Sequence, residues 1–248
     1  MTPTALRSTS PGTELPLSTF QTISDSKKAF HKAFTHIIPP LYRRTSDELL
    51  VELHLLSHQS DFRVDGLFAV GLRQVFDAFT RGYRPAEHLS PLFDALCTSN
   101  GFDPTELKSL NEASLQAVRG NDLNDVRRWL QEAGKGAPEP LAELLHRAEH
   151  SEFYYSRLMA VGLLTLLGAA QGEDCSEPDT LRQIAHDLAE SLGFSRSRVE
   201  KDLCLYVANI EKMAQAVEVM EEAIASERRK RERQAQEFNG IVNNSSIS

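Results

Sequence analysis

The stretch Tyr42-Arg-Arg-Thr-Ser-Asp-Glu-Leu-Leu-Val-Glu-Leu-His-Leu-Leu-Ser57, one residue after two prolines, decides the fold of this chain. Leu49, Leu53 and Leu56 recur at steps of four and three, the spacing of one face of an α-helix. Further aliphatic side chains widen this face almost all round, as in a helix that lies deep in a core. The stretch therefore predicts a buried helix with other helices packed around it.

The first turn of this helix carries two arginines where a helix disfavours them. Arg43 and Arg44 sit at the positive end of the helix dipole, and Asp47 and Glu48 follow them in the weaker order for an i, i+4 ion pair. We expect acids from another helix to fix both arginines, because buried arginines need fixed partners. The alternative is that Tyr42, Arg43 and Arg44 form a contact surface for protein partners or a membrane.

Composition limits the class of protein. The chain has 248 residues, a formal net charge of −8, a pI near 5.5 and 41 % hydrophobic residues. This length supports one domain with an appendage. The acidic balance argues against a nucleic-acid partner, which requires a surplus of basic side chains facing phosphates.

The cysteines, the longest apolar run and the first residues of the chain indicate in which cellular compartment the protein works. Cys97, Cys175 and Cys204 are odd in number, far apart and in no CxxC pair, so they predict a reducing compartment without disulfides. The longest apolar run, residues 158–170, is too short to cross a bilayer and reads as a central core helix. Residues 1–21 are rich in Ser, Thr and Pro, which is typical of a disordered tail rather than a signal or transit peptide.

Helix start and stop residues recur along the whole chain, and no run of alternating β-branched residues indicates a strand. The predicted helix starts are Ser24 or Asp25, Asp65, Ser90, Asp103 and Asn121. The sequence therefore predicts an all-α protein, with a compact multi-helix core domain over residues 22–195.

The last helix differs in kind. From Val199 to Ile224 apolar residues recur at an average step of 3.5, which is a heptad seam. This seam spans about 38 Å at 1.5 Å per residue, close to the roughly 40 Å diameter of the core domain. We therefore expect a coiled-coil-like helix over residues 196–238 whose seam packs along its own core, with a disordered tail at 239–248. Self-association through the seam is the alternative.

The end of this helix is charged on all sides. The candidate interaction residues there are Arg228, Arg229, Lys230, Arg231 and Arg233. We expect this end to project into solvent as a contact for a partner or an anionic surface. The opposing interpretation is a solvated helix with no further role.

Catalytic and metal-binding patterns are weak. His146-x-x-Glu149-His150 fits the inverted zinc-protease pattern, and Glu227 is available as a third ligand. The absence of a predicted sheet and the charged surroundings of Glu227 favour a polar helix end instead. A second i, i+4 pair, His54 and His58, favours core histidines over metal ligands. We therefore predict no metal, no cofactor and no catalytic residues.

Several segments together resemble the thylakoid formation family, also described as a photosystem II biogenesis protein, of cyanobacteria and chloroplasts. Beside the stretch of residues 42–57, the resemblance rests on Asp61-Phe62, Phe68-Ala-Val-Gly71, Phe76-Asp77, Gly82-Tyr83-x-Pro85, Phe93-Asp-Ala-Leu-Cys97, Phe153-Tyr-Tyr-Ser-Arg-Leu158, Val199-Glu-Lys-Asp-Leu203 and Glu227-Arg-Arg-Lys-Arg231. It covers residues 22–238. Val64 and Gly66 depart from the family pattern, and residues 134–140 match no family motif.

The resemblance implies an all-helical, non-enzymatic factor with a long C-terminal helix. It implies a role in thylakoid formation and in photosystem II assembly and repair, with the FtsH membrane protease as partner. The absence of a transit peptide favours a cyanobacterial member, cytoplasmic and peripherally associated with the thylakoid membrane. The alternatives are a zinc-dependent hydrolase and a helical adaptor unrelated to photosynthesis.

Overall fold

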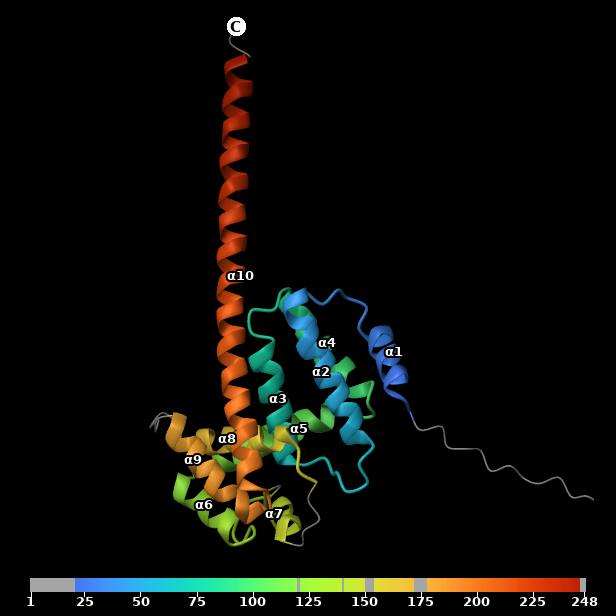
Figure 1. The fold of residues 1–248 in the computed structure, drawn as a ribbon, viewed down its shortest axis with the longest axis vertical. Helices are drawn as coiled ribbons and strands as arrows, with labels where there is room; N and C mark the ends of the chain where they lie inside the picture. Colours follow the sequence, from blue (N-terminus) through green and yellow to red (C-terminus); the bar gives the residue numbers. More distant parts are fainter. Residues whose placement is uncertain (1–20, 120, 140, 150–153, 172–177, 246–248) are drawn as a thin grey trace, which may run out of the picture.

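Helices alone build the fold over the residues that the computed structural model describes, which are 21–119, 121–139, 141–149, 154–171 and 178–245. The elements are α1 (Ile23–Ala33), α2 (Pro40–Ser57), α3 (Gly66–Phe79), the 3-10 turn η1 (Ala86–His88), α4 (Leu89–Thr98), α5 (Pro104–Val118), α6 (Leu123–Gln131), α7 (Leu141–Glu149), α8 (Arg157–Gln171), α9 (Pro178–Ala189), η2 (Glu190–Leu192) and α10 (Arg196–Ser245). Figure 1 shows the shorter helices gathered around α3, while α10 rises far beyond them. The predicted all-α class with a long C-terminal helix is confirmed.

The centre of the core is the crossing of α3 and α8. A Cβ atom added to Gly71 would overlap the carbonyl oxygen of Leu158, and one added to Gly162 would overlap that of Leu67. The two helices therefore meet backbone to backbone, and only glycine fits at the two contact points. The apolar run predicted as a core helix is α8. In the part of the chain that the structure describes, no helix is both long enough and apolar enough to cross a membrane.

Two predicted helix starts are confirmed by their capping hydrogen bonds. The carboxylate of Asp65 accepts the Phe68 N–H at 2.9 Å, and that of Asp103 accepts the Thr105 N–H at 2.8 Å. Asp65 is also buried, with Arg147 of α7 donating to its second oxygen at 3.0 Å. Burial raises the pKa of Asp65 to about 6, against the opposing effect of both hydrogen bonds.

The other three predicted starts differ from the observed ones. Thr22 caps α1, and Asp25 returns the hydrogen bond, so Asp25 is the third helical residue of a capping box. The cap predicted at Ser90 is wrong, because η1 runs directly into α4 and leaves no free turn there. Asp122 caps α6 in place of Asn121, whose side chain instead donates to the Ala117 carbonyl oxygen at 2.9 Å.

The long helix α10 divides into a buried half and an exposed half. Val199 and Leu203 are fully buried and Met213 and Val217 are nearly so, which agrees with the prediction that the seam packs along its own core. Ile224, the last member of the predicted seam, is 60 % exposed. Beyond the body the helix continues to Ser245, seven residues past its predicted end at residue 238.

The start of α10 at Arg196 coincides with the boundary predicted between the core domain and the last helix. The predicted tail at 239–248 corresponds mostly to the last turns of α10. The tail predicted at 1–21 lies outside the described residues, except for Gln21, whose side-chain amide donates to the Ser99 carbonyl oxygen at 2.8 Å.

Candidate functional site

Tyr42 fixes the start of α2 to the core. Its side chain is 1 % exposed, its hydroxyl donates to the Arg81 carbonyl oxygen at 3.1 Å, and its ring lies 5.0 Å from that of Tyr83. Burial raises the pKa of this hydroxyl. A side chain this enclosed holds the fold together and offers no contact area to a partner.

The two arginines that follow Tyr42 point outward. The Arg44 side chain is 89 % exposed and its Nε lies 2.8 Å from Glu48 Oε1, one turn along the same helix. Arg43 is exposed and donates to the Ile38 carbonyl oxygen at 3.4 Å. The prediction that acids of another helix fix both arginines is therefore wrong. The buried face of α2 runs from Tyr42 through Leu49, which turns residues 43 and 44 to the surface.

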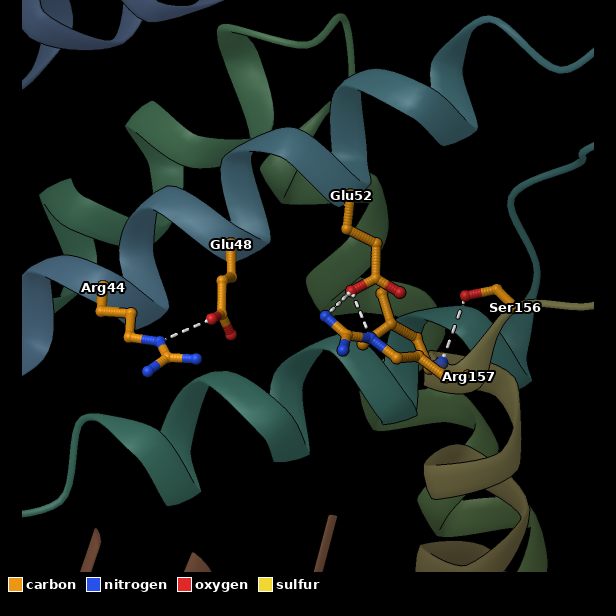
Figure 2. A network of polar contacts seen from close by, with 6 residues as sticks. Arg44, Glu48, Glu52, Ser156 and Arg157 are labelled. Carbon is orange, nitrogen blue, oxygen red and sulfur yellow. Dashed lines mark hydrogen bonds and ion pairs between the residues drawn. The ribbon is translucent and has the colours of Figure 1, made fainter. Parts of the chain in front are cut away.

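A tie between α2 and another helix exists about two turns after the arginines, through Glu52 instead. Glu52, 15 % exposed, accepts from Arg157 at the start of α8, with Nη2 at 2.6 Å and Nε at 2.8 Å (Figure 2). Partial burial opposes the charge of Arg157, but the hydrogen bond and the charge of Glu52 outweigh it and raise its pKa. Ser156 Oγ accepts the Leu158 N–H at 3.1 Å and so satisfies a free donor at this helix start.

Tyr155 connects the same point to α10. Its hydroxyl donates to Asp202 at 2.7 Å, and the Arg198 guanidinium lies 4.7 Å from the centre of its ring. The ring also packs edge to face against that of Phe194, with the ring centres 5.0 Å apart. Burial, followed by the hydrogen bond to Asp202, raises the pKa of the Tyr155 hydroxyl. The start of α8 is thus joined to both α2 and α10.

Between α2 and α10 the surface is hollowed. Two hollows of about 440 and 1040 Å³ share six lining residues and form one continuous depression, which we call the α2–α10 groove. The shared residues are Arg44, Glu48, Arg157, Asp202, Leu205 and Asn209. Side chains of α3 and α8, such as Phe79 and Val161, also line it. The groove combines an apolar lining with charged groups, of which Arg44 pairs with Glu48 and Arg157 with Glu52.

The candidate residues at the end of α10 lie on an exposed helix. Arg228 pairs with Glu232 at 2.9 Å and Arg231 with Glu227 at 3.3 Å, while Arg229 donates to the Ala225 carbonyl oxygen at 3.2 Å. These are contacts along one helix, each of small energy. Five basic side chains against two glutamates leave residues 227–233 with an excess of positive charge.

Known proteins are similar in sequence to this chain over most of its length. Residues 22–235 match the family model for the thylakoid formation protein. The chain belongs to the thylakoid formation family. It is 61 % identical over 217 residues to the protein Thf1 of Prochlorococcus marinus strain MIT 9313, covering 87 % of this chain and 89 % of that one. It is 42 % identical over 218 residues to Thf1 of Synechococcus elongatus, covering 87 % and 86 %.

A solved structure extends the similarity to the fold. A structure of Psb29 aligns with a TM-score of 0.73 and 36 % sequence identity, covering 85 % of this chain and 98 % of that one. The family resemblance drawn from the sequence motifs is confirmed. Among those motifs, Phe153-Tyr-Tyr-Ser-Arg-Leu158 contains Tyr155 and Arg157, whose side chains join the start of α8 to α10 and α2. The family motif therefore marks these two residues in the sequence, but it does not indicate that Asp202 and Glu52 are their partners.

The two histidines of the predicted i, i+4 pair, His54 and His58, lie in different surroundings. His54 Nδ1 lies 2.9 Å from the buried Ser26 Oγ, which fits the core-histidine interpretation, whereas His58 is exposed and hydrogen-bonds back to the His54 carbonyl oxygen at 2.8 Å. Burial, followed by the nearby His58, lowers the pKa of His54.

The zinc-site candidate is only partly described. His146 is exposed near the end of α7, while the Glu149 side chain and His150 lie outside the described residues. Over the described part of the chain, no group of three His, Cys, Asp or Glu could hold a metal ion. Absence of a metal stays a prediction. Trp129 and Cys97 are buried, Cys204 is exposed, and Cys175 lies outside the described residues.

Proposed function

We propose that this protein is a non-enzymatic assembly factor of the thylakoid membrane, which supports assembly and repair of photosystem II by partnering the FtsH membrane protease. Two observations support the proposal. The chain belongs to the thylakoid formation family, and the second half of α10 stands clear of the body (Figure 1). Residues 218–245 rise about 42 Å at 1.5 Å per residue, which is long enough to reach a partner well away from the core.

The observation that carries the partner contact is the charge pattern of this exposed half. Arg229, Lys230 and Arg233 have no ion pair with an acid in the described part of the chain. Exposed basic groups that form no ion pair within the chain can pair with the acidic surface of a partner. We propose that they contact an acidic region of the protease, with the protein held peripherally on the cytoplasmic side of the thylakoid membrane.

Recovery of the protease from solubilised thylakoids tests this proposal. A tagged chain carrying Arg229→Glu, Lys230→Glu and Arg233→Glu should recover at least about 10-fold less FtsH than the wild type, because three attractive contacts become repulsive. The control carries Lys27→Glu, Lys28→Glu and Lys32→Glu on α1, which changes the net charge equally at an exposed site. Equal loss in both variants, or none in either, contradicts a contact through α10.

Binding to lipid vesicles distinguishes a protein contact from a membrane contact. Against vesicles of phosphatidylglycerol and phosphatidylcholine, the wild type and the α10 variant should sediment alike if the basic groups serve the protease. A wild type that binds the anionic vesicles, with binding lost at high salt and in the α10 variant, assigns these residues to the membrane instead.

A further inference from the structure

Large exposed apolar side chains gather in two places on this molecule. Those recorded over the described residues are Ile37, Val51, Leu55, Leu205, Val219 and Ile224. Val51, Leu55 and Leu205 line the α2–α10 groove. Val219 and Ile224 lie on α10 after Val217, the last seam residue recorded as buried, so each region exposes apolar surface that packing would cover.

The charges outside ion pairs differ between the two regions. In the groove, Arg44 pairs with Glu48 and Arg157 with Glu52. The other charged lining residues are three basic ones and two acidic ones, which are Arg43, Arg198, Lys212, Asp47 and Asp202. Asp202 accepts a hydrogen bond from Tyr155, so the balance of the groove is basic. Beyond the body, Glu218 and Glu222 are exposed, and over the described residues neither has a basic partner.

We propose that the α2–α10 groove receives residues 218–224 of a second copy of this chain, in a reciprocal antiparallel dimer. The segment cannot reach the groove of its own chain, because α10 is one continuous helix that carries it away from the body (Figure 1). Each copy has one groove and one segment. Two copies related by a two-fold axis therefore satisfy both contacts at once and form a closed pair.

The groove wall and the segment belong to one row of side chains on α10. Asp202, Leu205, Asn209, Lys212 and Ala216 line the groove at alternating steps of three and four. The same steps lead on to Val219 and Ala223. In an antiparallel pair, the first part of one row meets the second part of the other. The alanines allow close approach, and Glu218 and Glu222 of one copy lie on the side of Lys212 of the other.

This contact differs from a coiled-coil dimer through the heptad seam. Val199, Leu203, Met213 and Val217 are buried against the core of their own chain, so that face of α10 is already covered. The row through Leu205 lies on a different face and is open to solvent: Leu205 is 49 % and Val219 66 % exposed.

Sedimentation equilibrium of the purified full-length chain tests the dimer. We expect a concentration-dependent dimer, and Leu205→Glu and Val219→Glu should each weaken it by at least about 10-fold, because both place a charge in the apolar contact. Ile37→Glu is the matched control, since Ile37 is 85 % exposed and lines neither hollow of the groove. Circular dichroism should show the same helix content in all variants.

A charge exchange tests the direction of the pairing. Lys212→Glu alone should weaken the dimer, and adding Glu218→Lys should restore most of the lost affinity. A wild-type chain that stays monomeric up to about 1 mM, the weak limit of specific binding, overturns the proposal. So does a dimer that Leu205→Glu and Val219→Glu leave intact. The test uses purified protein alone, so its result is independent of any contact with the protease.

Discussion

The α3–α8 crossing and the projecting half of α10 are both helical, but different interactions stabilise them. At the crossing, two backbones touch where Gly71 and Gly162 leave no side chain between them. Residues 226–236 of α10 are all exposed, and the ion pairs among them join side chains one turn apart. Tertiary packing specifies the first region, while local backbone and side-chain contacts alone support the second. Substitutions should therefore be costly in one and nearly free in the other.

The largest effect is expected at the helix crossing. Gly71→Ala should lower the free energy of unfolding by about 3–5 kcal/mol, because the new methyl group overlaps the Leu158 carbonyl oxygen and both helices must move apart. Urea denaturation followed by circular dichroism measures this loss. Gly101→Ala is the control: its added Cβ meets no atom within 4 Å, and its left-handed φ of +81° alone should cost about 1–2 kcal/mol. A smaller loss for Gly71→Ala than for Gly101→Ala contradicts the close crossing.

The next effect concerns pH. The pKa of Asp65 rises from 3.8 to about 6 on folding, so the folded state binds this proton more tightly. The stabilisation is complete below pH 3.8 and is lost as the pH rises through 6, a fall of about 3 kcal/mol from this carboxyl. Asp65→Asn keeps a capping oxygen but does not titrate. The stability of the wild type minus that of Asp65→Asn should therefore decrease between pH 4 and 7, and a constant difference would argue against a buried titrating carboxyl.

A pair of arginine variants compares a contact between helices with a contact within one. Arg157→Met should cost about 1–3 kcal/mol, because it leaves Glu52, 15 % exposed, without its partner. Arg44→Met removes an exposed pair within α2 and should cost about 0.5 kcal/mol or less. Thermal denaturation of both variants measures the difference. Equal melting temperatures would mean that the tie between α2 and α8 adds no stability.

The smallest effect is expected at the end of α10. A chain ending at Ala225 should unfold with a free energy within about 0.5 kcal/mol of the full chain, because residues 226–236, the removed residues whose burial the structure describes, are all exposed. A chain ending at Ser195 should aggregate, since it exposes the surface that Val199 and Leu203 cover. Marked destabilisation of the longer truncation would show that the projecting half packs on its own core.

The sequence predicts those parts of the fold that depend on the local spacing of apolar residues. The buried face of α2 and the seam of α10 repeat at helical spacing, and both pack on the core as the pattern predicts, the seam as far as Val217. The α3–α8 crossing could not be predicted, because a glycine inside a helix does not indicate which backbone approaches it. The Tyr155–Asp202 hydrogen bond joins residues 47 positions apart, and no local rule pairs them.

The candidate site shows the same division. The exposed basic part of α10 follows from the lack of an apolar stripe after Ile224, whereas the outward direction of Arg43 and Arg44 depends on which face of α2 packs against the core. Their unfavourable position at a helix start indicated a need for an acidic partner. The partner of Arg44 is a neighbour in the same helix, and the acid on α2 that ties it to another helix is Glu52.

The continuity of α10 has a consequence for amide hydrogen exchange. Its 50 residues form one ladder of backbone hydrogen bonds, but the two ends of this ladder open by different routes. Amides up to about Val217 can exchange only when the core unfolds, while those further along can exchange by fraying from the C-terminal end. A partner that binds the C-terminal end of α10 would suppress this fraying. Protection of the amides in the last turns from hydrogen exchange would therefore report directly on partner binding at that end.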